Sequence, residues 1–148
     1  MGAATHYTRG VHEAANPVLL EVTGLAKRYR PDRPPVFAGV ELALAAGEYV
    51  AIMGESGVGK STLLNLIAGL DRPDGGAIRL DGTDIVALDD NAATRLRRRQ
   101  LGFVFQAFHV LPYLTVAQNV ALPLDLLGVA RRESAARVAT LLAAVGLD

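Results

Sequence analysis

The chain has 148 residues, 51% of them hydrophobic, which suits one domain or a piece of a larger one. Its 15 Lys and Arg balance its 15 Asp and Glu, so charge gives no reason to expect nucleic acid or an anionic membrane as the main partner. There is no Cys, which excludes disulfides and thiolate metal sites. No apolar stretch approaches the roughly 18 residues of a membrane-spanning helix.

In the N-terminal half, residues 1–16 are small and polar without a period, and we expect a flexible tail there. Short apolar runs between glycine or proline turns then predict strands, at Val18–Val22, Ala26–Arg30, Val40–Ala45, Tyr49–Met53 and Ala77–Leu80. Gly24 would turn the chain between the first two strands. The continuous apolar run Tyr49–Met53 is typical of a strand buried on both faces.

The remaining pattern is mainly helical. Lys60–Gly69 carries leucines at helical spacing, and a second helix is expected to begin near Asp89 and to end at Arg97–Arg99, charges that suit the helix dipole. The apolar run Leu101–Phe105 predicts a further buried strand. Helices should follow from Thr115, where the pattern predicts a capping box and Pro123 a kink or split, and over Arg131–Val145, which Gly146 should stop.

The stretch between the strand Tyr49–Met53 and the helix from Lys60 matches G-x-x-x-x-G-K-[ST] in full. Its glycines let the backbone wrap around phosphates, and the free amides at the start of the helix add positive charge. A lysine here reaches the terminal phosphates, and the following hydroxyl is a ligand for Mg²⁺. The sequence therefore predicts a site for a nucleoside triphosphate with Mg²⁺, formed by Gly54, Glu55, Ser56, Gly57, Val58, Gly59, Lys60, Ser61 and Thr62.

That loop alone leaves GTPases, kinases and several ATPase classes open. Further motifs narrow the choice, in the order Tyr29, Ala68–Gly76, Leu80–Ile85, Gly102–Gln106 and Leu111–Val120. Together they resemble the ATP-binding cassette (ABC) transporter ATPases, and most of all the subfamily that serves lipoprotein release and macrolide export. The resemblance runs from about Val18 to Asp148.

The resemblance implies ATP as the nucleotide and gives two more residues a role. Tyr29 matches the aromatic residue that stacks on adenine, a contact made by the ring. Gln106 matches the glutamine that touches Mg²⁺ and the attacking water. Lys60 and Gln106 are thus the expected catalytic residues, and Ser61 and Gln106 the expected metal ligands. Without the resemblance, Tyr29 would be an ordinary strand residue and Gln106 an exposed loop residue.

The fold that the resemblance implies is α/β: a P-loop NTPase core with an antiparallel N-terminal β portion, a parallel core of strands and the start of a helical subdomain. We expect the nucleotide-binding core over residues 17–110 and the helical subdomain from 111 to 148. The signature motif, the acidic pair that follows it and the switch histidine of the family do not occur before Asp148. The chain is therefore expected to be incomplete at its C-terminus and to bind ATP without hydrolysing it.

For the parent protein, the resemblance implies an ATPase that powers a transporter. The expected partners are a transmembrane permease subunit and a second ATP-binding subunit, with no nucleic acid, and the expected location is the cytoplasmic face of the cell membrane. Two alternatives stay open. One is a soluble ABC ATPase that acts on nucleic acid or ribosomes, and the other is a module that senses nucleotide without hydrolysis.

Overall fold

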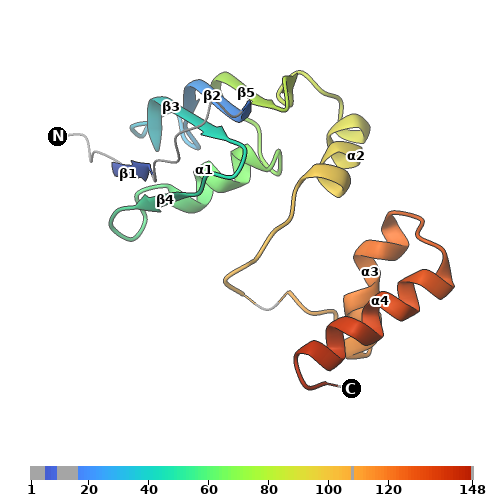
Figure 1. The fold of residues 1–148 in the computed structure, drawn as a ribbon. Helices are drawn as coiled ribbons and strands as arrows, with labels where there is room; N and C mark the ends of the chain where they lie inside the picture. The colour runs from blue at the N-terminus through green and yellow to red at the C-terminus, as the bar shows by residue number, and fades with distance from the viewer. Residues whose placement is uncertain (1–5, 10–16, 108, 148) are drawn as a thin grey trace. The chain divides into compact units, whose positions relative to one another are not determined.

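The structure is a computed structural model that describes residues 6–9, 17–107 and 109–147. The chain forms two compact units, Met1–Ala93 and Thr94–Asp148, so the division falls inside a helix. Figure 1 shows the elements of both units. The boundary between residues 110 and 111 that the sequence suggests stays a prediction.

The main sheet of the first unit is antiparallel, with strand order β3-β2-β5-β6. Strand β2 pairs with β3 on one side and with the shorter β5 on the other, and the two-residue strand β6 pairs with β5. The bounds are β2 Val18–Lys27, β3 Phe37–Ala45, β5 Gly75–Leu80 and β6 Thr83–Asp84. This sheet is the antiparallel N-terminal β portion expected from the sequence.

Gly24 does not turn the chain, and the two strands predicted on either side of it are one strand, β2. Gly24 has φ +58°, and the pairing of β2 with β3 shifts register between Val22 and Leu25. A glycine at positive φ fits a bulge as well as a turn. The strand also ends earlier than predicted, at Lys27, which leaves Tyr29 in a bend beyond it.

Helix α1 (Lys60–Ile67) lies along one face of the sheet (Figure 1). The largest fully buried side chains come from the helix and from two strands, namely Val22, Leu25, Leu66 and Ile78. Of the leucines whose helical spacing predicted α1, Leu63 and Leu66 are buried, whereas Leu64 is 52% exposed. Packing of α1 on these strands therefore fixes the start of the helix relative to the sheet.

Strand β4 (Val50–Met53) pairs antiparallel with β1 (His6–Arg9), and the two form a separate sheet. Strand β1 lies in the predicted tail, where no strand was expected, and residues 1–5 and 10–16 of that tail are outside the described residues. Backbone groups of an unpaired strand need partners, and β1 supplies them along β4. The predicted burial on both faces is wrong, because Met53 is 54% exposed. Within the described ranges no strands pair in parallel, so the predicted parallel core is not observed there.

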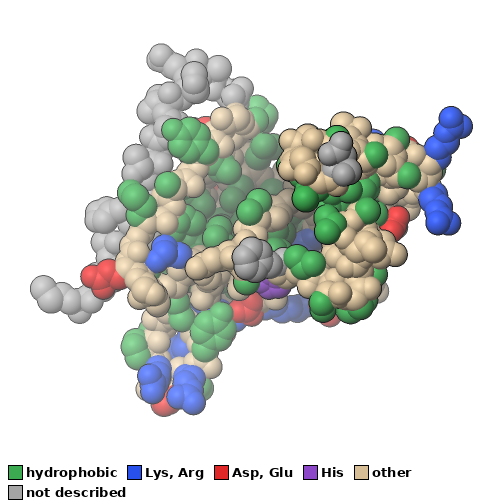
Figure 2. All heavy atoms as spheres, turned by 90° about the horizontal axis from the view of Figure 1, so that it is seen from below, with side chains coloured by type: hydrophobic (Ala, Val, Ile, Leu, Met, Phe, Trp, Pro, Cys, Tyr) green, Lys and Arg blue, Asp and Glu red, His purple; other side chains and the backbone are tan. Residues whose placement is uncertain are grey.

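Helix α2 (Asp90–Gln100) begins and ends where the charges predicted. The Asp89 carboxylate accepts the Ala92 amide at 2.7 Å and so caps the first turn, while arginines occupy the last turn. The next segment, 101–107, was predicted to begin with a buried strand and forms none. Val104 is fully exposed there, and no described strand pairs with it. Other hydrophobic side chains also reach the surface among polar atoms (Figure 2).

In the second unit, α3 (Val116–Leu126) and α4 (Arg131–Ala144) pack as a helical hairpin. The predicted capping box is confirmed, since the Thr115 amide donates to Gln118 Oε1 at 2.8 Å and the Gln118 amide donates to Thr115 Oγ1 at 3.2 Å. Asn119 reinforces the turn by bonding both backbone groups of Leu111. Such local patterns need no distant partner.

Two other expectations for this unit concern Pro123 in α3 and Gly146 after α4. Pro123 lies inside α3, which continues to Leu126, so the predicted split does not occur and the predicted kink stays a prediction. Gly146, at φ +71°, follows the end of α4 as predicted. On α4, Val138 is buried, whereas Leu141 is 55% exposed. None of the helices in the described part of the chain is long and apolar enough to cross a membrane.

Candidate functional site

The predicted phosphate loop connects β4 to α1, as its motif requires. Its residues Gly54–Gly57 are exposed, and Val58, Gly59, Lys60 and Thr62 are half-buried. Ser61 is exposed at the first turn of the helix. The structure thus brings the nine predicted loop residues together as one strand–loop–helix unit.

Glycines give this loop its path. Gly54, Gly57 and Gly59 have φ of +154°, +81° and +105°, values that side chains rarely adopt. At Gly59 there is also no space, since a Cβ atom there would lie 2.5 Å from Cγ1 of Val36. The loop can therefore pass close to the end of the main sheet only with glycine at position 59.

The ammonium of Lys60 points back into the loop. It donates to the carbonyl oxygens of Gly54 at 2.8 Å and Glu55 at 2.7 Å. These contacts close the loop around the charge and hold it beside the backbone. A phosphate oxygen would be a stronger acceptor than a neutral carbonyl, because both partners of the bond would then be charged.

The start of α1 is free of competing groups. Its N-cap is Gly59, which offers no side-chain cap, and its first turn carries no acidic residue. The first amides of a helix have no partner within the helix and favour anions. Across the described ranges there is no cluster of three or more His, Asp or Glu side chains that could hold a metal. An ion here would depend on the Ser61 hydroxyl and on oxygens of the ligand itself.

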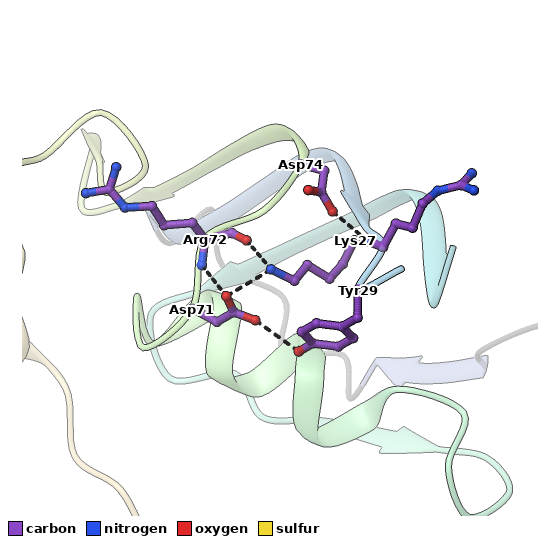
Figure 3. Close-up of polar contacts among 6 residues, drawn as sticks. Lys27, Tyr29, Asp71, Arg72 and Asp74 are labelled. Atoms are coloured by element: carbon purple, nitrogen blue, oxygen red, sulfur yellow. Dashed lines mark hydrogen bonds and ion pairs between the residues drawn. The ribbon is translucent and has the colours of Figure 1, made fainter. Parts of the chain in front are cut away.

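Tyr29, the predicted adenine contact, is 59% exposed and is held by its hydroxyl (Figure 3). The hydroxyl donates to Oδ2 of Asp71 at 2.9 Å, and the Lys27 ammonium lies 4.9 Å from the ring centroid. Lys27 in turn donates to Asp71 Oδ1 at 2.9 Å and to the carbonyl of Arg72 at 2.6 Å. Ring and carboxylate therefore form one bonded cluster with a buried lysine.

Hydrogen bonds determine the protonation state of Asp71 in this cluster. The Lys27 ammonium lowers the pKa of Asp71 below its usual value of 3.8, burial opposes this, and the Tyr29 hydroxyl and the Arg72 amide lower it further. Asp71 is therefore a carboxylate at neutral pH and accepts from both sides. Neither Lys27 nor Asp71 has a role that its sequence pattern predicts. Lys27 could have been noticed, because it stands two positions before Tyr29 as the one charged residue that ends an apolar strand face.

Gln106, the other predicted catalytic residue, lies in an exposed bend of the segment 101–107. It belongs to the second unit and the phosphate loop to the first. Its contact with Mg²⁺ therefore stays a prediction, as do the roles of the loop residues and of Tyr29. His109, which has φ +40°, contacts Phe105 with ring centroids 4.5 Å apart.

A strand, a glycine loop containing an inward-pointing lysine and an uncapped helix place this chain among the P-loop nucleotide-binding proteins. A family model described as ABC transporter matches residues 37–148. The chain belongs to the ABC transporter family.

Relatives and solved structures agree with this assignment. The chain is 52% identical over 107 residues to the lipoprotein-releasing system ATP-binding protein LolD of Anaeromyxobacter dehalogenans, covering 71% of this chain and 45% of that protein. It is 42% identical over 132 residues to the macrolide export ATP-binding/permease protein MacB of Shigella flexneri, covering 88% and 20%. Among solved structures, the dimeric ATP-binding cassette MJ0796 bound to ADP and Pi matches with TM-score 0.73 and 34% identity, covering 84% and 56%. The chain spans about half the length of the LolD relatives that it matches.

Proposed function

We propose that this chain binds MgATP through the loop Gly54–Ser61 as the nucleotide-binding part of an ABC transporter. The observation that carries the proposal is the position of the Lys60 ammonium, which lies inside a loop with glycines at three positions of positive φ. A cation there, next to free helix amides, suits the β- and γ-phosphates of a nucleotide.

Each group of the loop has a part in binding. Lys60 would exchange the two loop carbonyls for phosphate oxygens, which replaces neutral acceptors with charged ones. The amides at the start of α1 would surround the same phosphates, and the Ser61 hydroxyl would contact Mg²⁺. Mg²⁺ usually keeps several waters and relies on substrate phosphates, which agrees with the lack of an acidic cluster in the described part of the chain.

For the whole protein we extend the proposal to ATP hydrolysis that powers a membrane permease. The similarity to proteins named for lipoprotein release and macrolide export supports export or lipoprotein release as the process. The similarity to a dimeric cassette supports pairing with a second ATP-binding subunit. Such a protein would work at the cytoplasmic face of the membrane through its permease, with Gln106 at the Mg²⁺ ion and Tyr29 on adenine.

Calorimetric titration of MgATP into the chain and into Lys60→Ala tests the binding proposal. Loss of a hydrogen bond between charged groups costs about 1.5–3 kcal/mol, so the affinity should fall roughly 10- to 150-fold. Arg79→Ala is a matched control, because it removes an exposed cation that pairs with Glu21 far along the sheet from the loop. Equal affinity of Lys60→Ala and the parent chain would contradict the proposal.

The metal part of the proposal needs a separate titration. Affinity for ATP should rise on adding Mg²⁺ to the parent chain, and this gain should shrink in Ser61→Ala, which keeps the backbone amide but loses the hydroxyl. Thr23→Ala removes the hydroxyl of an exposed residue of β2, outside the loop, and should leave the gain unaltered. An equal gain from Mg²⁺ in Ser61→Ala and in the parent would remove Ser61 from the metal site.

A further inference from the structure

The turn after α1 is fastened to the end of β2 by several bonds (Figure 3). Lys27 reaches both Asp71 and the Arg72 carbonyl, and the Asp74 amide donates to the carbonyl of Ala26 at 2.9 Å. The Asp74 carboxylate accepts the Arg28 amide at 2.6 Å. These bonds hold the three residues that directly precede Tyr29, so the chain enters Tyr29 from a fixed position.

The side chain of Tyr29 is then oriented by two neighbours. Its hydroxyl is bound to Asp71 Oδ2 and its ring lies near the Lys27 ammonium, 4.9 Å from the centroid. A cation over an aromatic ring is attracted to the ring face and occupies it. Since 59% of Tyr29 remains exposed, a flat ligand has access to this residue.

Helix α1 connects this cluster to the phosphate loop. Lys60 is in its first turn, and a tight turn at its other end leads to Asp71, with the Gly69 amide bonded to Leu66 and the Leu70 amide to Asn65, each at 2.9 Å. The buried side of α1 holds the helix on the sheet. The two ends of one packed helix thus carry a phosphate-binding lysine and the carboxylate that holds the aromatic ring.

We propose that Asp71 is a positioning residue for nucleotide binding, because its carboxylate fixes the Tyr29 ring, through the hydroxyl and through Lys27, as a platform for the adenine base. This inference rests on the proposed function of the loop and adds a residue to the same site. Stacking on a base does not need the Tyr29 hydroxyl, and the proposal gives this group the role of holding the ring through Asp71. A ring that is already in place loses less conformational freedom when the base binds.

The test compares MgATP with magnesium tripolyphosphate, which has the phosphates of ATP and no base. Tyr29→Phe removes only the hydroxyl, and Asp71→Ala removes its acceptor. A hydrogen bond contributes about 0.5–1.5 kcal/mol, so each variant should lower MgATP affinity roughly two- to tenfold and leave tripolyphosphate affinity unchanged. The double variant should lose no more than the larger single loss, because both changes break the same bond.

Asp90→Asn is the matched control, since it removes an exposed carboxylate that pairs with the neighbouring Arg72 and does not touch Tyr29. Its affinities for both ligands should equal those of the parent chain. Unfolding curves of all variants show whether each protein is folded at the titration temperature. If Asp71→Ala is too unstable to measure, Tyr29→Phe and Asp71→Asn carry the test. Asp71→Asn keeps the shape of the side chain but leaves one acceptor oxygen for two donors, the Tyr29 hydroxyl and the Lys27 ammonium, so it should also lower MgATP affinity.

The outcomes separate the two proposals. If the parent chain binds neither ligand, the proposed function is wrong. If it binds both and Tyr29→Phe binds ATP as the parent does, the phosphate loop stands and the positioning role is overturned. Equal losses for ATP and tripolyphosphate would also overturn it, since they would show a general structural effect of Asp71 on α1.

Discussion

The stretches Val50–Ser61 and Leu101–Ala107 begin alike and fold differently. Each opens with a short apolar run and leads to polar residues predicted to meet the nucleotide and its metal. The first run forms β4 and pairs with β1, and its loop is closed by Lys60. The second forms no strand and is exposed. An apolar run becomes a strand only where a neighbour completes its hydrogen bonds.

The difference also separates two kinds of predicted site residue. The loop is specified by glycines and by a lysine that bonds to residues five and six positions earlier, so its geometry is local. Gln106 depends on whatever positions the segment around it. The resemblance assigns Gln106 a role at the metal, and that role can be tested only when the residues around Gln106 are in their working positions.

The largest expected effect separates the packed helix from the exposed segment. Leu66 is 1% exposed and Val104 is fully exposed. Leu66→Ala should lower the free energy of unfolding by about 2–5 kcal/mol, the usual cost of a cavity in a core. Val104→Ala should change it by less than about 0.5 kcal/mol. Denaturant unfolding of the three chains measures both values. A large cost at Val104 would mean that the segment packs after all.

Glycine substitutions compare the backbone of the phosphate loop with the backbone of the exposed segment 101–107. Gly59→Ala should cost about 1–3 kcal/mol of unfolding free energy, because alanine at φ +105° is strained and its Cβ would collide with Val36. It should also weaken MgATP binding. Gly102→Ala is the matched control, since nothing lies within 4 Å of its added Cβ.

Thermal unfolding and calorimetric titration of these two glycine variants give both readouts. We expect Gly102→Ala to behave like the parent chain in each. If Gly59→Ala were as stable as the parent and bound MgATP equally well, the loop would not need its observed path. The chain would then match the phosphate-loop motif in sequence without needing the loop geometry to bind MgATP.

Local patterns account for the parts of the fold that the sequence predicted. The phosphate loop, the capping box at Thr115 and the stop at Gly146 each depend on residues within a few positions of one another. Gly24 was misread because positive φ suits a turn and a bulge equally. The Leu101–Phe105 run was misread because composition cannot show whether a strand has a partner.

The cluster around Tyr29 could not be read from a local pattern. Lys27 and Asp71 are 44 positions apart, and Tyr29 and Asp71 are 42 apart. Only the packing of α1 and its following turn on the sheet brings them together. The resemblance gave Tyr29 its role through the ring, and the structure adds what holds the ring.

The smallest expected effect concerns the charge of this cluster. The pKa of Asp71 in the folded chain lies below its usual value of 3.8, because Lys27 stabilises the carboxylate. The carboxylate therefore contributes stability that is fully present above the unfolded pKa and is lost as the pH falls through the folded pKa. Asp71→Asn should lower the free energy of unfolding near neutral pH by up to about 1 kcal/mol, the size of a partly exposed ion pair.

In acid the parent chain and Asp71→Asn should converge, because a protonated carboxyl and an amide are both neutral. The difference between them should stay constant down to about pH 5 and then shrink below the usual pKa of 3.8. Asp90→Asn is the control, because it makes the same carboxylate-to-amide change at a side chain that is 94% exposed. Urea unfolding of the three chains over this pH range makes the comparison. A difference between parent and Asp71→Asn that persists below the folded pKa would mean that the shape of the side chain, and not its charge, fastens α1 to the end of β2.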